Sequence, residues 1–443
     1  MRRNSIHNPF RNDILRAFDR LGGAATANQL RDALGVSQPT VSRWLGAARN
    51  EIVRMGRARA ARYARLRDLR ELGPRHDVWR IDEAGRPASF GTLHLLHNGG
   101  HWLSHPGAEE EGELFEGLPP FVGDMAPQGF LGRTFTARHP DLLLPPRPSD
   151  WSGDHQLVAL LRRGEDCPGD LVLGRESMDR WLASAPEAVS RADYIELARR
   201  AAAGDVGSSA GGEQPKFAAW CEGRHVLVKY VGESAGDAAD RWRDLLACEA
   251  LALEHLESIG VSAARCSFVA DGAFRFLEVE RFDRVGPRGR RGVVSLSAAD
   301  NEWTGLGGNW SGVATALHAQ GRLSAEDAQR VRWLDVFGGL IGNSDRHGGN
   351  LSFFTAHDGR LALAPVYDML PMLFAPHQTE VVERPFTPRP PTADSLDVWR
   401  SAADAARGYW ARLLEARHIS AAFRSRAERC AAALEELSAR VPV

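Results

Sequence analysis

Lysine is almost absent from this sequence of 443 residues. Only Lys216 and Lys229 occur among the 55 basic residues, and all the others are arginines. A bias toward arginine codons explains the general loss, but it does not explain why the two exceptions lie close together in the chain. A compact ammonium fits against clustered anions where a planar guanidinium does not. The pair therefore indicates an anion-binding site, unless it arose by chance.

Long apolar runs and cysteine clusters are also missing. No stretch approaches the roughly 18 apolar residues of a membrane-spanning helix, and residues 1–13 are polar and charged where a signal peptide is apolar. We therefore expect a cytoplasmic protein with no membrane partner. The five cysteines are too far apart for a CxxC or a Cys/His metal motif, so we expect reduced thiols. They are Cys167, Cys221, Cys248, Cys266 and Cys430.

Charge is distributed unevenly along the chain. The net charge is −2, yet residues 1–75 contain sixteen arginines and only six acidic residues. Such a split is typical of a basic nucleic-acid-binding segment attached to an acidic body. The content of 43% apolar and 25% charged residues is that of a globular protein, and the length suggests about three domains at roughly 150 residues each.

The basic segment has the pattern of a winged helix-turn-helix domain, which predicts double-stranded DNA as a partner. Apolar spacing predicts helices over 10–22, 27–34 and 38–48, with Val41, Trp44 and Leu45 packed inward. Residues 52–66 read as two short strands around a basic wing. A small helical protein-interaction domain is the alternative. The residues expected to face DNA are Gln38, Thr40, Ser42, Arg43, Arg57 and Arg59.

The remainder of the chain predicts a β-rich part followed by a helical part. Residues 77–102 alternate between apolar and polar side chains around two turns, which is typical of antiparallel strands. We expect 106–154, rich in proline and glycine, to be mostly loop. From 193 to 230 we expect strand, loop and strand, then a helix, two strands, and mostly helix from 324 onward.

Both lysines belong to segments that suit nucleotide phosphates. A loop of small residues, 208–216, ends in Lys216, and backbone N–H groups in such a loop can surround a phosphate. A flexible surface turn is the alternative. The apolar strand HVLVKY presents Lys229, and a helix with Glu249 follows. Kinases place ATP with such a strand lysine and helix glutamate.

The segment 274–284, FRFLEVERFDR, is an apolar strand that leads into Glu280 and Phe282. A chain crossing between two lobes offers backbone hydrogen bonds to adenine, with an apolar ring as cover. Core packing of Phe282 is the alternative interpretation.

The strongest pattern is DRHGGN, followed by a second acidic motif. Asp345 precedes Asn350 by five residues, and Asp368 follows in VYDM. In a phosphotransferase, one aspartate accepts the proton of the acceptor hydroxyl, while an asparagine and a second aspartate hold magnesium. The alternative, a polar loop before a hairpin, does not account for the ordered set.

These motifs together resemble the HipA family of serine/threonine protein kinases. DRHGGN is similar to the catalytic loop of that family, VYDM to its metal motif, VERFDR to its hinge and SSAGGEQPK to its glycine-rich loop. The resemblance extends from about residue 78 to residue 430. It implies an α+β, bilobal protein-kinase-like fold behind the winged helix-turn-helix domain, with ATP and Mg²⁺ as cofactors. The implied units are 1–75, a β-rich subdomain over 76–190, a kinase N-lobe core over 191–285 and a helical C-lobe over 286–443.

The resemblance also implies a role for each site residue. Asp345 would be the catalytic base, and Asn350 and Asp368 the metal ligands. Autophosphorylation would fall on Ser208 or Ser209, and the choice stays open because this loop is one residue longer than is usual in the family. The implied ATP-binding residues are Lys229, Glu249, Glu280, Phe282, Ser209, Gly211, Gly212 and Lys216.

Partners follow from the same likeness. Similar kinases phosphorylate a translation component such as an aminoacyl-tRNA synthetase, although the sequence does not identify the substrate. The fused DNA-binding segment resembles the solitary branch of the family and suggests regulation in cis, and winged helices often act as homodimers. Two alternatives remain: a DNA-binding transcription regulator whose kinase-like domain senses nucleotide, and a small-molecule kinase.

Overall fold

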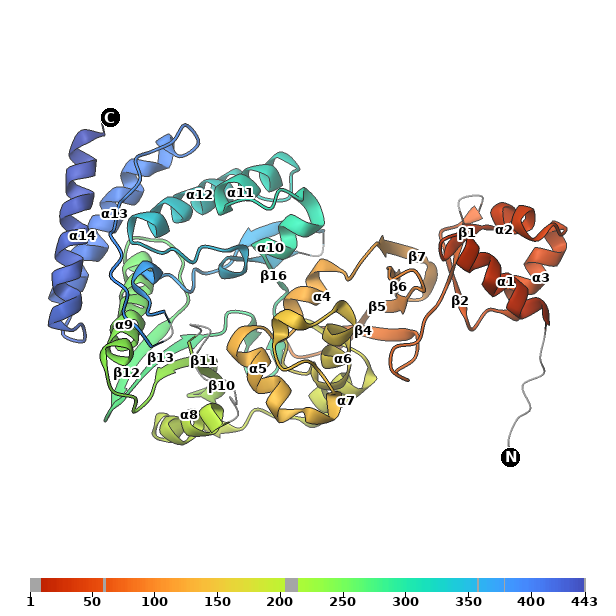
Figure 1. Ribbon diagram of the computed structural model, residues 1–443, viewed down its shortest axis with the longest axis horizontal. Coiled ribbons are helices and arrows are strands. Elements are labelled where there is room, and N and C mark those ends of the chain that lie inside the picture. The colour runs from red at the N-terminus through yellow and green to blue at the C-terminus, as the bar shows by residue number, and fades with distance from the viewer. Residues whose placement is uncertain (1–8, 59–60, 204–213, 357, 378, 442–443) are drawn as a thin grey trace.

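The protein is described by a computed structural model that covers residues 9–58, 61–203, 214–356, 358–377 and 379–441. The N-terminal helices lie at one end of an elongated molecule, and the C-terminal helices lie at the other (Figure 1). Between them the chain passes through a middle unit and then through a β-rich and a helical lobe.

The N-terminal unit combines three helices with a small sheet of order β1-β3-β2. The side chain and backbone of Thr26 form a capping box with Gln29 at the start of the second helix, and Gly35, with a φ of 63°, ends it. Val41, Trp44 and Leu45 are buried, which confirms their expected inward packing. The elements are α1 (Pro9–Arg20), β1 (Ala24–Thr26), α2 (Ala27–Leu34), α3 (Gln38–Ala47), β2 (Ile52–Met55) and β3 (Arg62–Arg65).

The middle unit is a five-stranded antiparallel sheet of order β7-β6-β5-β4-β8, covered by helices. The expectation that 106–154 is mostly loop is wrong, because this range contains a strand, two α-helices and two 3₁₀-helices. They are short, and packing against the core stabilises them rather than intrinsic propensity. The elements are β4 (Arg75–Ile81), β5 (Pro87–Leu95), β6 (His101–His105), β7 (Ala108–Phe115), α4 (Pro120–Met125), α5 (Gly129–Arg138), η2 (Pro140–Leu142), η3 (Pro148–Asp150), α6 (Gly153–Arg163), β8 (Leu171–Leu173) and α7 (Arg175–Ala183).

The β-rich lobe contains a second five-stranded sheet, of order β12-β13-β11-β10-β9. The expectation of a strand directly after residue 193 is wrong, because α8 occupies that place. Its buried residues Tyr194, Ala198 and Ala201 have helical spacing, which the many small residues obscure in the sequence. The elements are β9 (Ala188–Val189), η4 (Arg191–Asp193), α8 (Tyr194–Ala203), β10 (Lys216–Cys221), β11 (Arg224–Val231), α9 (Asp237–Ser258), β12 (Cys266–Asp271) and β13 (Phe274–Glu280).

The C-terminal lobe is mainly helical and includes a small sheet of order β16-β17-β18. Large side chains such as Trp310, Phe337 and Trp410 fill its core. The elements are β14 (Arg284–Val285), β15 (Gly289–Arg290), β16 (Val293–Ser295), α10 (Leu296–Ala299), η5 (Asp300–Thr304), α11 (Trp310–Ala319), α12 (Ala325–Leu340), η6 (Gly348–Asn350), β17 (Ser352–Thr355), β18 (Leu361–Leu363), η7 (Met372–Phe374), α13 (Leu396–Glu415) and α14 (Ala421–Arg440).

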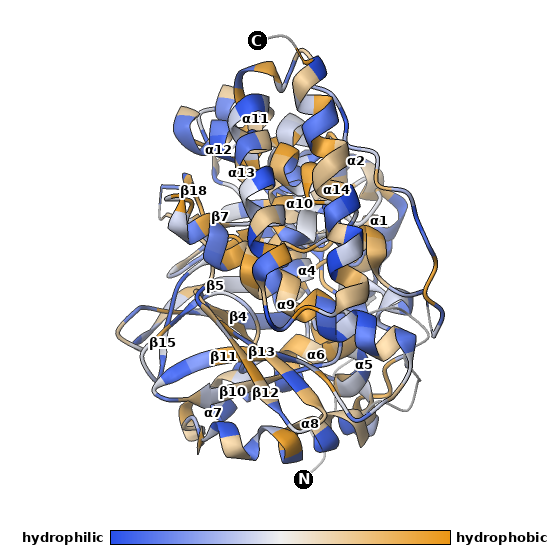
Figure 2. Ribbon diagram, turned by 90° about the vertical axis from the view of Figure 1, so that its left-hand side faces the viewer, coloured by the Kyte–Doolittle hydropathy of each residue, from blue (hydrophilic) through white to orange (hydrophobic). Residues whose placement is uncertain are grey.

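Helix α9 joins the two lobes. Figure 2 shows the strands β10–β13 in one half of the view, the helices α11–α14 in the other, and α9 between them. Leu246 and Ala250 pack with the strands of the β-rich lobe, whereas Leu245 and Leu253 belong to the core of the helical lobe. A residue on α9 therefore lies at the boundary between the lobes. Within the described residues, no helix is both long and apolar enough to cross a membrane.

Candidate active site

The two lysines lie opposite each other on neighbouring strands. In the antiparallel pairing of β10 with β11, Lys216 is the register partner of Lys229. Residues directly opposite in such a pair have side chains on the same face of the sheet. The two lysines of the sequence therefore direct their ammonium groups to one site.

Lys229 contacts two carboxylates from different parts of the fold. Its Nζ lies 2.6 and 2.7 Å from the two carboxylate oxygens of Glu249 on α9, and it also pairs with Asp368 Oδ1. Lys229 and Glu249 are 6% and 1% exposed, so this ion pair is almost dry. The expected pair of a strand lysine and a helix glutamate is therefore formed, and the second acidic motif lies beside it.

The charges of this cluster alter its protonation equilibria. Burial opposes the charge on Lys229, but Asp368 and Glu249 outweigh it and raise the pKa of the ammonium. Burial also opposes the charge on Asp368, yet Lys229 and Lys216 together lower the pKa of that carboxyl to about 2. Burial, with the charge of Asp368, raises the pKa of Glu249 despite its contact with Lys229. Asp368 is therefore the anion that stays ionised most readily.

The loop after α12 connects Asp345 to Asp368 through Asn343. Asn343 is 1% exposed; its Oδ1 accepts a hydrogen bond from the Asp345 N–H at 3.0 Å, and its Nδ2 donates to the Asp368 carbonyl at 3.3 Å. Asn350 Nδ2 donates to the Asp345 carbonyl at 2.9 Å. Asp368 has a φ of 51°, a left-handed conformation that is costly for a residue with a side chain. The expected base and the two expected metal ligands thus belong to one hydrogen-bonded unit.

The donor set of this unit fits a hard cation. The carboxylate of Asp368 and the amide oxygen of Asn350 are the oxygen ligands that Mg²⁺ accepts, and Mg²⁺ usually adds water and substrate phosphates to one or two protein ligands. No group of three His, Cys, Asp or Glu side chains suited to a metal occurs among the described residues. Two oxygen donors of this kind suit a cation that completes its coordination with water or with oxygens of a bound ligand.

The two residues expected to form the hinge are partly engaged by the protein itself. The N–H of Glu280 donates to the Arg265 carbonyl at 2.8 Å, and its carboxylate lies 3.7 Å from Arg224 Nη1. The ring of Phe282 packs against Phe354 and Tyr367, with ring centroids 5.8 and 5.7 Å apart. Phe282 thus packs against the residue before Asp368, while Glu280 has a structural contact that the sequence does not reveal.

Several expected site residues lie outside the described residues. In the small-residue loop these are Ser208, Ser209, Gly211 and Gly212, and in the wing it is Arg59.

The residues expected to face DNA differ in their surroundings. Gln38, Ser42 and Arg43 are exposed on α3, whereas Thr40 is half-buried and its hydroxyl hydrogen-bonds that of Ser37 at 3.0 Å. Arg57 Nη1 forms an ion pair of 2.6 Å with Glu111 of β7.

Strand β2, which precedes Arg57 in the chain, also contacts β7 of the middle unit. Arg54 Nη1 pairs with Glu110 Oε1 at 2.6 Å, and the Gly56 N–H donates to the Glu110 carbonyl at 2.7 Å. The acidic strand β7 therefore covers part of the basic wing, which the sequence does not predict.

Three further contacts at the site are not predicted by the sequence. Tyr367 donates a hydrogen bond of 2.7 Å to the Gly349 carbonyl and ties the two motifs together. Arg346 Nε donates to Asp335 Oδ1 at 3.0 Å, and Asp335 Oδ2 accepts from the Ser311 hydroxyl at 2.8 Å. Tyr367 is part of the VYDM motif and could have been recognised, whereas Asp335 lies within α12 and looks like an ordinary helix residue.

Comparisons with known proteins agree with this geometry. Residues 72–182 match the model of the YjjJ-like toxin middle domain, and residues 208–442 match that of the HipA-like C-terminal domain. Toxin YjjJ of Escherichia coli (strain K12) is 35% identical over 434 residues, which cover 95% of this chain and 97% of that protein.

Solved structures add a likeness of fold. HipA of Shewanella oneidensis MR-1, solved with HipB and operator DNA, matches with a TM-score of 0.51 and 15% identity, covering 83% of this chain and 100% of that chain. The Helicobacter pylori proinflammatory kinase CtkA matches with a TM-score of 0.36 and 14% identity, over 53% of this chain and 94% of that chain. The HipA match shows a mixed α and β, kinase-like fold, and the expected resemblance to HipA proteins is confirmed. The chain belongs to the YjjJ-like toxin family and carries a HipA-like C-terminal domain.

Proposed function

We propose that this chain is an ATP- and Mg²⁺-dependent serine/threonine protein kinase with its own DNA-binding domain. The observation that supports it most is the contact of Lys229 with Glu249 and Asp368, because it joins the β-rich lobe, α9 and the acidic motif of the helical lobe. A kinase needs these three parts together before it can place a nucleotide.

Each residue has a distinct role in the proposed reaction. Lys229 holds the α- and β-phosphates, Glu249 fixes the direction of the ammonium, and Lys216 adds a second positive charge on the same face. Asp368 and Asn350 would hold Mg²⁺, which when bound neutralises charge that develops on the phosphates. Asp345 accepts the proton from the serine or threonine hydroxyl as that oxygen forms its bond to the γ-phosphorus.

The remaining proposed ATP contacts surround this core. The ring of Phe282 covers adenine, the backbone near Glu280 lines the adenine site, and Ser209, Gly211 and Gly212 belong to the phosphate loop. Autophosphorylation of Ser208 or Ser209 would place about two negative charges where ATP phosphates bind, and would thereby slow the enzyme.

A nucleotide-sensing regulator is the competing function. A sensor needs Lys229 and Asp368 to bind Mg-ATP, but it does not need a base beside them. Asp345 is exposed and is hydrogen-bonded through its N–H to Asn343, which also contacts Asp368. This arrangement favours catalysis over sensing.

The test uses the full-length chain, radiolabelled ATP and a cell lysate. Wild-type protein should label itself and at least one other protein, and the Asp345→Asn variant should bind ATP normally in calorimetry. Its phosphate transfer should fall by about 10²–10⁴-fold, the usual contribution of a positioned general base. Transfer at the wild-type rate by Asp345→Asn would contradict the proposed mechanism and favour the sensor.

Residues 1–75 are proposed to bind double-stranded DNA as a winged helix-turn-helix domain. Exposed Gln38, Ser42 and Arg43 on α3 support this, with Thr40 at its edge, and Arg57 and Arg59 would contact phosphates from the wing. HipA of Shewanella oneidensis was solved with a separate HipB protein and operator DNA, and here the DNA-binding part would lie in the same chain. A translation component such as an aminoacyl-tRNA synthetase is the proposed substrate, and a homodimer the proposed DNA-bound form.

A further inference from the structure

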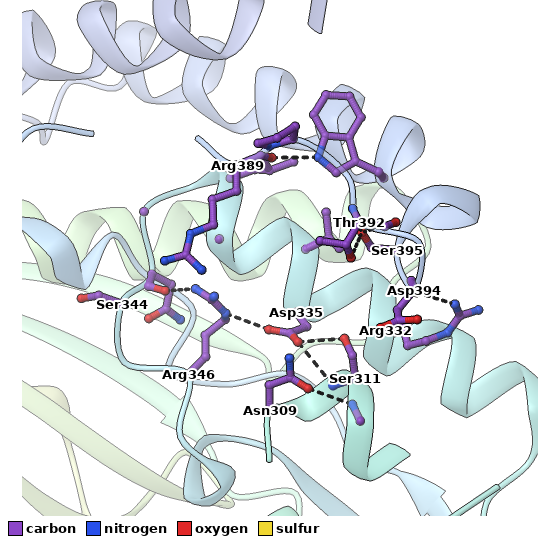
Figure 3. Close-up of a pocket in the computed structure, with 18 of the residues that line it drawn as sticks. Asn309, Ser311, Arg332, Asp335, Ser344, Arg346, Arg389, Thr392, Asp394 and Ser395 are labelled. Carbon is purple, nitrogen blue, oxygen red and sulfur yellow. Dashed lines mark hydrogen bonds and ion pairs between the residues drawn. The ribbon is translucent and has the colours of Figure 1, made fainter. Parts of the chain in front are cut away.

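A groove of about 1210 Å³ lies directly beside the catalytic loop. Its sides are α11, α12 and the extended segment 385–395, and its lining includes both neighbours of Asp345, namely Ser344 and Arg346 (Figure 3). Lys229, Glu249 and Asp368 are not among its lining residues. The groove is therefore separate from these three residues, and it reaches the two residues that flank the proposed base Asp345.

The outer wall of the groove is held in place by specific contacts. The segment 385–391 contains four prolines and no helix or strand. The indole N–H of Trp399 donates to the Arg389 carbonyl at 3.1 Å, and the ring of Phe386 packs edge-on against Trp410 at 5.9 Å. The prolines restrict the backbone of the segment 385–391, so this wall loses little conformational entropy when a ligand enters the groove.

The end of the groove near Ser344 carries one excess positive charge. The charge of Arg346 is balanced by its ion pair with Asp335. A Cβ on Gly338 would lie only 2.6 Å from the Arg346 side chain, so the glycine on α12 gives Arg346 the space that it needs to make this pair. Arg389 is exposed and forms no ion pair with any residue that the structure describes. Figure 3 shows its guanidinium directed into the groove on the side of Ser344 and Arg346.

The opposite end carries one excess negative charge. Arg332 Nη2 pairs with Asp397 Oδ2 at 2.6 Å, and Arg332 Nη1 donates to the Asp394 carbonyl at 2.9 Å. The carboxylate of Asp394 forms no ion pair with another described residue. Asp394 and Arg332 lie across the groove from Ser344 in Figure 3. The groove is thus positive next to the base and negative away from it.

We propose that this groove binds the acceptor segment of the protein substrate as an extended peptide. The acceptor hydroxyl lies at Asp345, an acidic side chain next to it pairs with Arg389, and a basic side chain farther along pairs with Asp394. This inference rests on the proposed kinase function. In that reaction the hydroxyl oxygen bonds to the γ-phosphorus, the bond from the γ-phosphorus to the β,γ-bridging oxygen breaks, ADP leaves, and the proton passes to Asp345.

Size and charge favour a peptide over the other classes of ligand. Small-molecule pockets usually measure about 300–1,000 Å³, and this groove is larger. A nucleic acid carries only negative charge, and it would be repelled by the carboxylate of Asp394 at one end. Complementary charges of both signs, spaced along one chain, are a property of peptides.

The test measures sequence preference with the full-length protein. Wild-type chain, Arg389→Glu and Asp394→Arg are each given radiolabelled ATP and a library of serine and threonine peptides in which one flanking position at a time is varied. Arg417→Glu is the matched control, because Arg417 is exposed and lies outside the groove lining. The KM for ATP is measured for each variant and should stay unchanged.

The wild-type chain should prefer an acidic residue beside the acceptor and a basic residue farther away. Arg389→Glu should reverse the first preference by roughly fivefold in kcat/KM and keep the second, as expected for partly exposed ion pairs. Asp394→Arg should reverse only the second preference, and Arg417→Glu should match wild type. Phosphorylation without charge preference, or a wild-type profile in Arg389→Glu, would overturn the groove assignment while the kinase function stands. No transfer by wild type to any peptide or to itself would overturn the proposed function instead.

Discussion

Replacing Lys229 with methionine should separate the structural cost of the buried charge cluster from its functional role. Methionine removes the ammonium and keeps most of the apolar volume, so Glu249, which is 1% exposed, loses its cation. Breaking a buried pair by removing one partner typically costs about 3–5 kcal/mol. Protonation sets an upper limit on the part of this cost that comes from Glu249, because that carboxyl can become neutral instead of staying charged.

The size of that limit depends on pH. Neutralising a carboxyl whose ordinary pKa is 4.5 costs about 3.4 kcal/mol at pH 7, from about 1.36 kcal/mol for each pH unit. At pH 5 the same step costs less than about 1 kcal/mol. The pKa of Glu249 is already raised in the wild type, and it rises further without Lys229, so the variant should regain stability relative to wild type as pH falls from 7 to 5.

The assay is urea unfolding of wild type, Lys229→Met and the double variant Lys229→Met/Glu249→Gln at both pH values. The single variant should lose about 3 kcal/mol at pH 7 and about 1 kcal/mol at pH 5. The double variant should recover part of this stability, because the unpaired charge of Glu249 is gone while Asp368 still lacks Lys229. Both variants should lose ATP binding in calorimetry. A loss at pH 7 below about 1 kcal/mol, or wild-type affinity for ATP in either variant, would refute the reasoning.

Two further predictions concern DNA and pH. Glu111→Gln frees Arg57 from its ion pair, so it should raise the affinity of the full chain for a labelled DNA duplex by about twofold to fivefold at low salt. Arg43→Ala should lower this affinity. Anisotropy titrations measure both changes, and affinities equal to that of wild type would contradict both expectations. Burial lowers the pKa of His94 from 6.5 to about 4, so its contribution to stability is present above pH 6.5 and is lost as pH falls toward 4. In urea unfolding, His94→Gln should show a weaker decline of stability over this range, and an unaltered pH slope would count against the assignment.

That the two acidic motifs and Lys229 lie together could be predicted because their signals are local. Asp345 and Asn350 belong to one short loop, and Asp368 follows in a motif with Tyr367. Lys229 lies in an apolar strand, and the scarcity of lysine sets it apart from the other basic residues of the chain. Chemistry that needs residue types at fixed spacing leaves a pattern along the chain, and such a pattern does not depend on knowing the fold.

The supporting contacts could not be predicted, because each joins residues whose relation appears only after folding. Asp335 looks like a solvated helix residue until α12 brings it to Arg346. Glu111 lies in a segment expected to be loop, and its contact with Arg57 appears only once the segment folds as β7. The sequence predicts a strand where α8 lies because small residues weaken the helical period, and burial of Tyr194 resolves the choice.

The middle unit is attached at both ends by contacts that are buried or partly buried. Toward the kinase-like lobes, Asp124 Oδ1 accepts from the Ser295 hydroxyl at 2.7 Å, and Asp283, 6% exposed, accepts from the Gly169 N–H at 3.0 Å. Hydrogen bonds to charged groups contribute about 1.5–3 kcal/mol each. Toward the N-terminal unit, Val53 and Met55 of β2 share a buried apolar cluster with Leu96 and Trp102 of the middle unit.

The ion pairs of the wing add little to this second attachment. The side chains of Arg54 and Arg57 are 39% and 65% exposed in their pairs with Glu110 and Glu111. Exposed pairs contribute about 0.2–1 kcal/mol each and weaken further with salt, whereas burying one large apolar side chain contributes about 1.5–3 kcal/mol. DNA phosphates that compete for Arg57 therefore replace the weaker kind of contact and leave the apolar cluster in place. The proposed binding of DNA should accordingly leave the N-terminal unit attached to the middle unit.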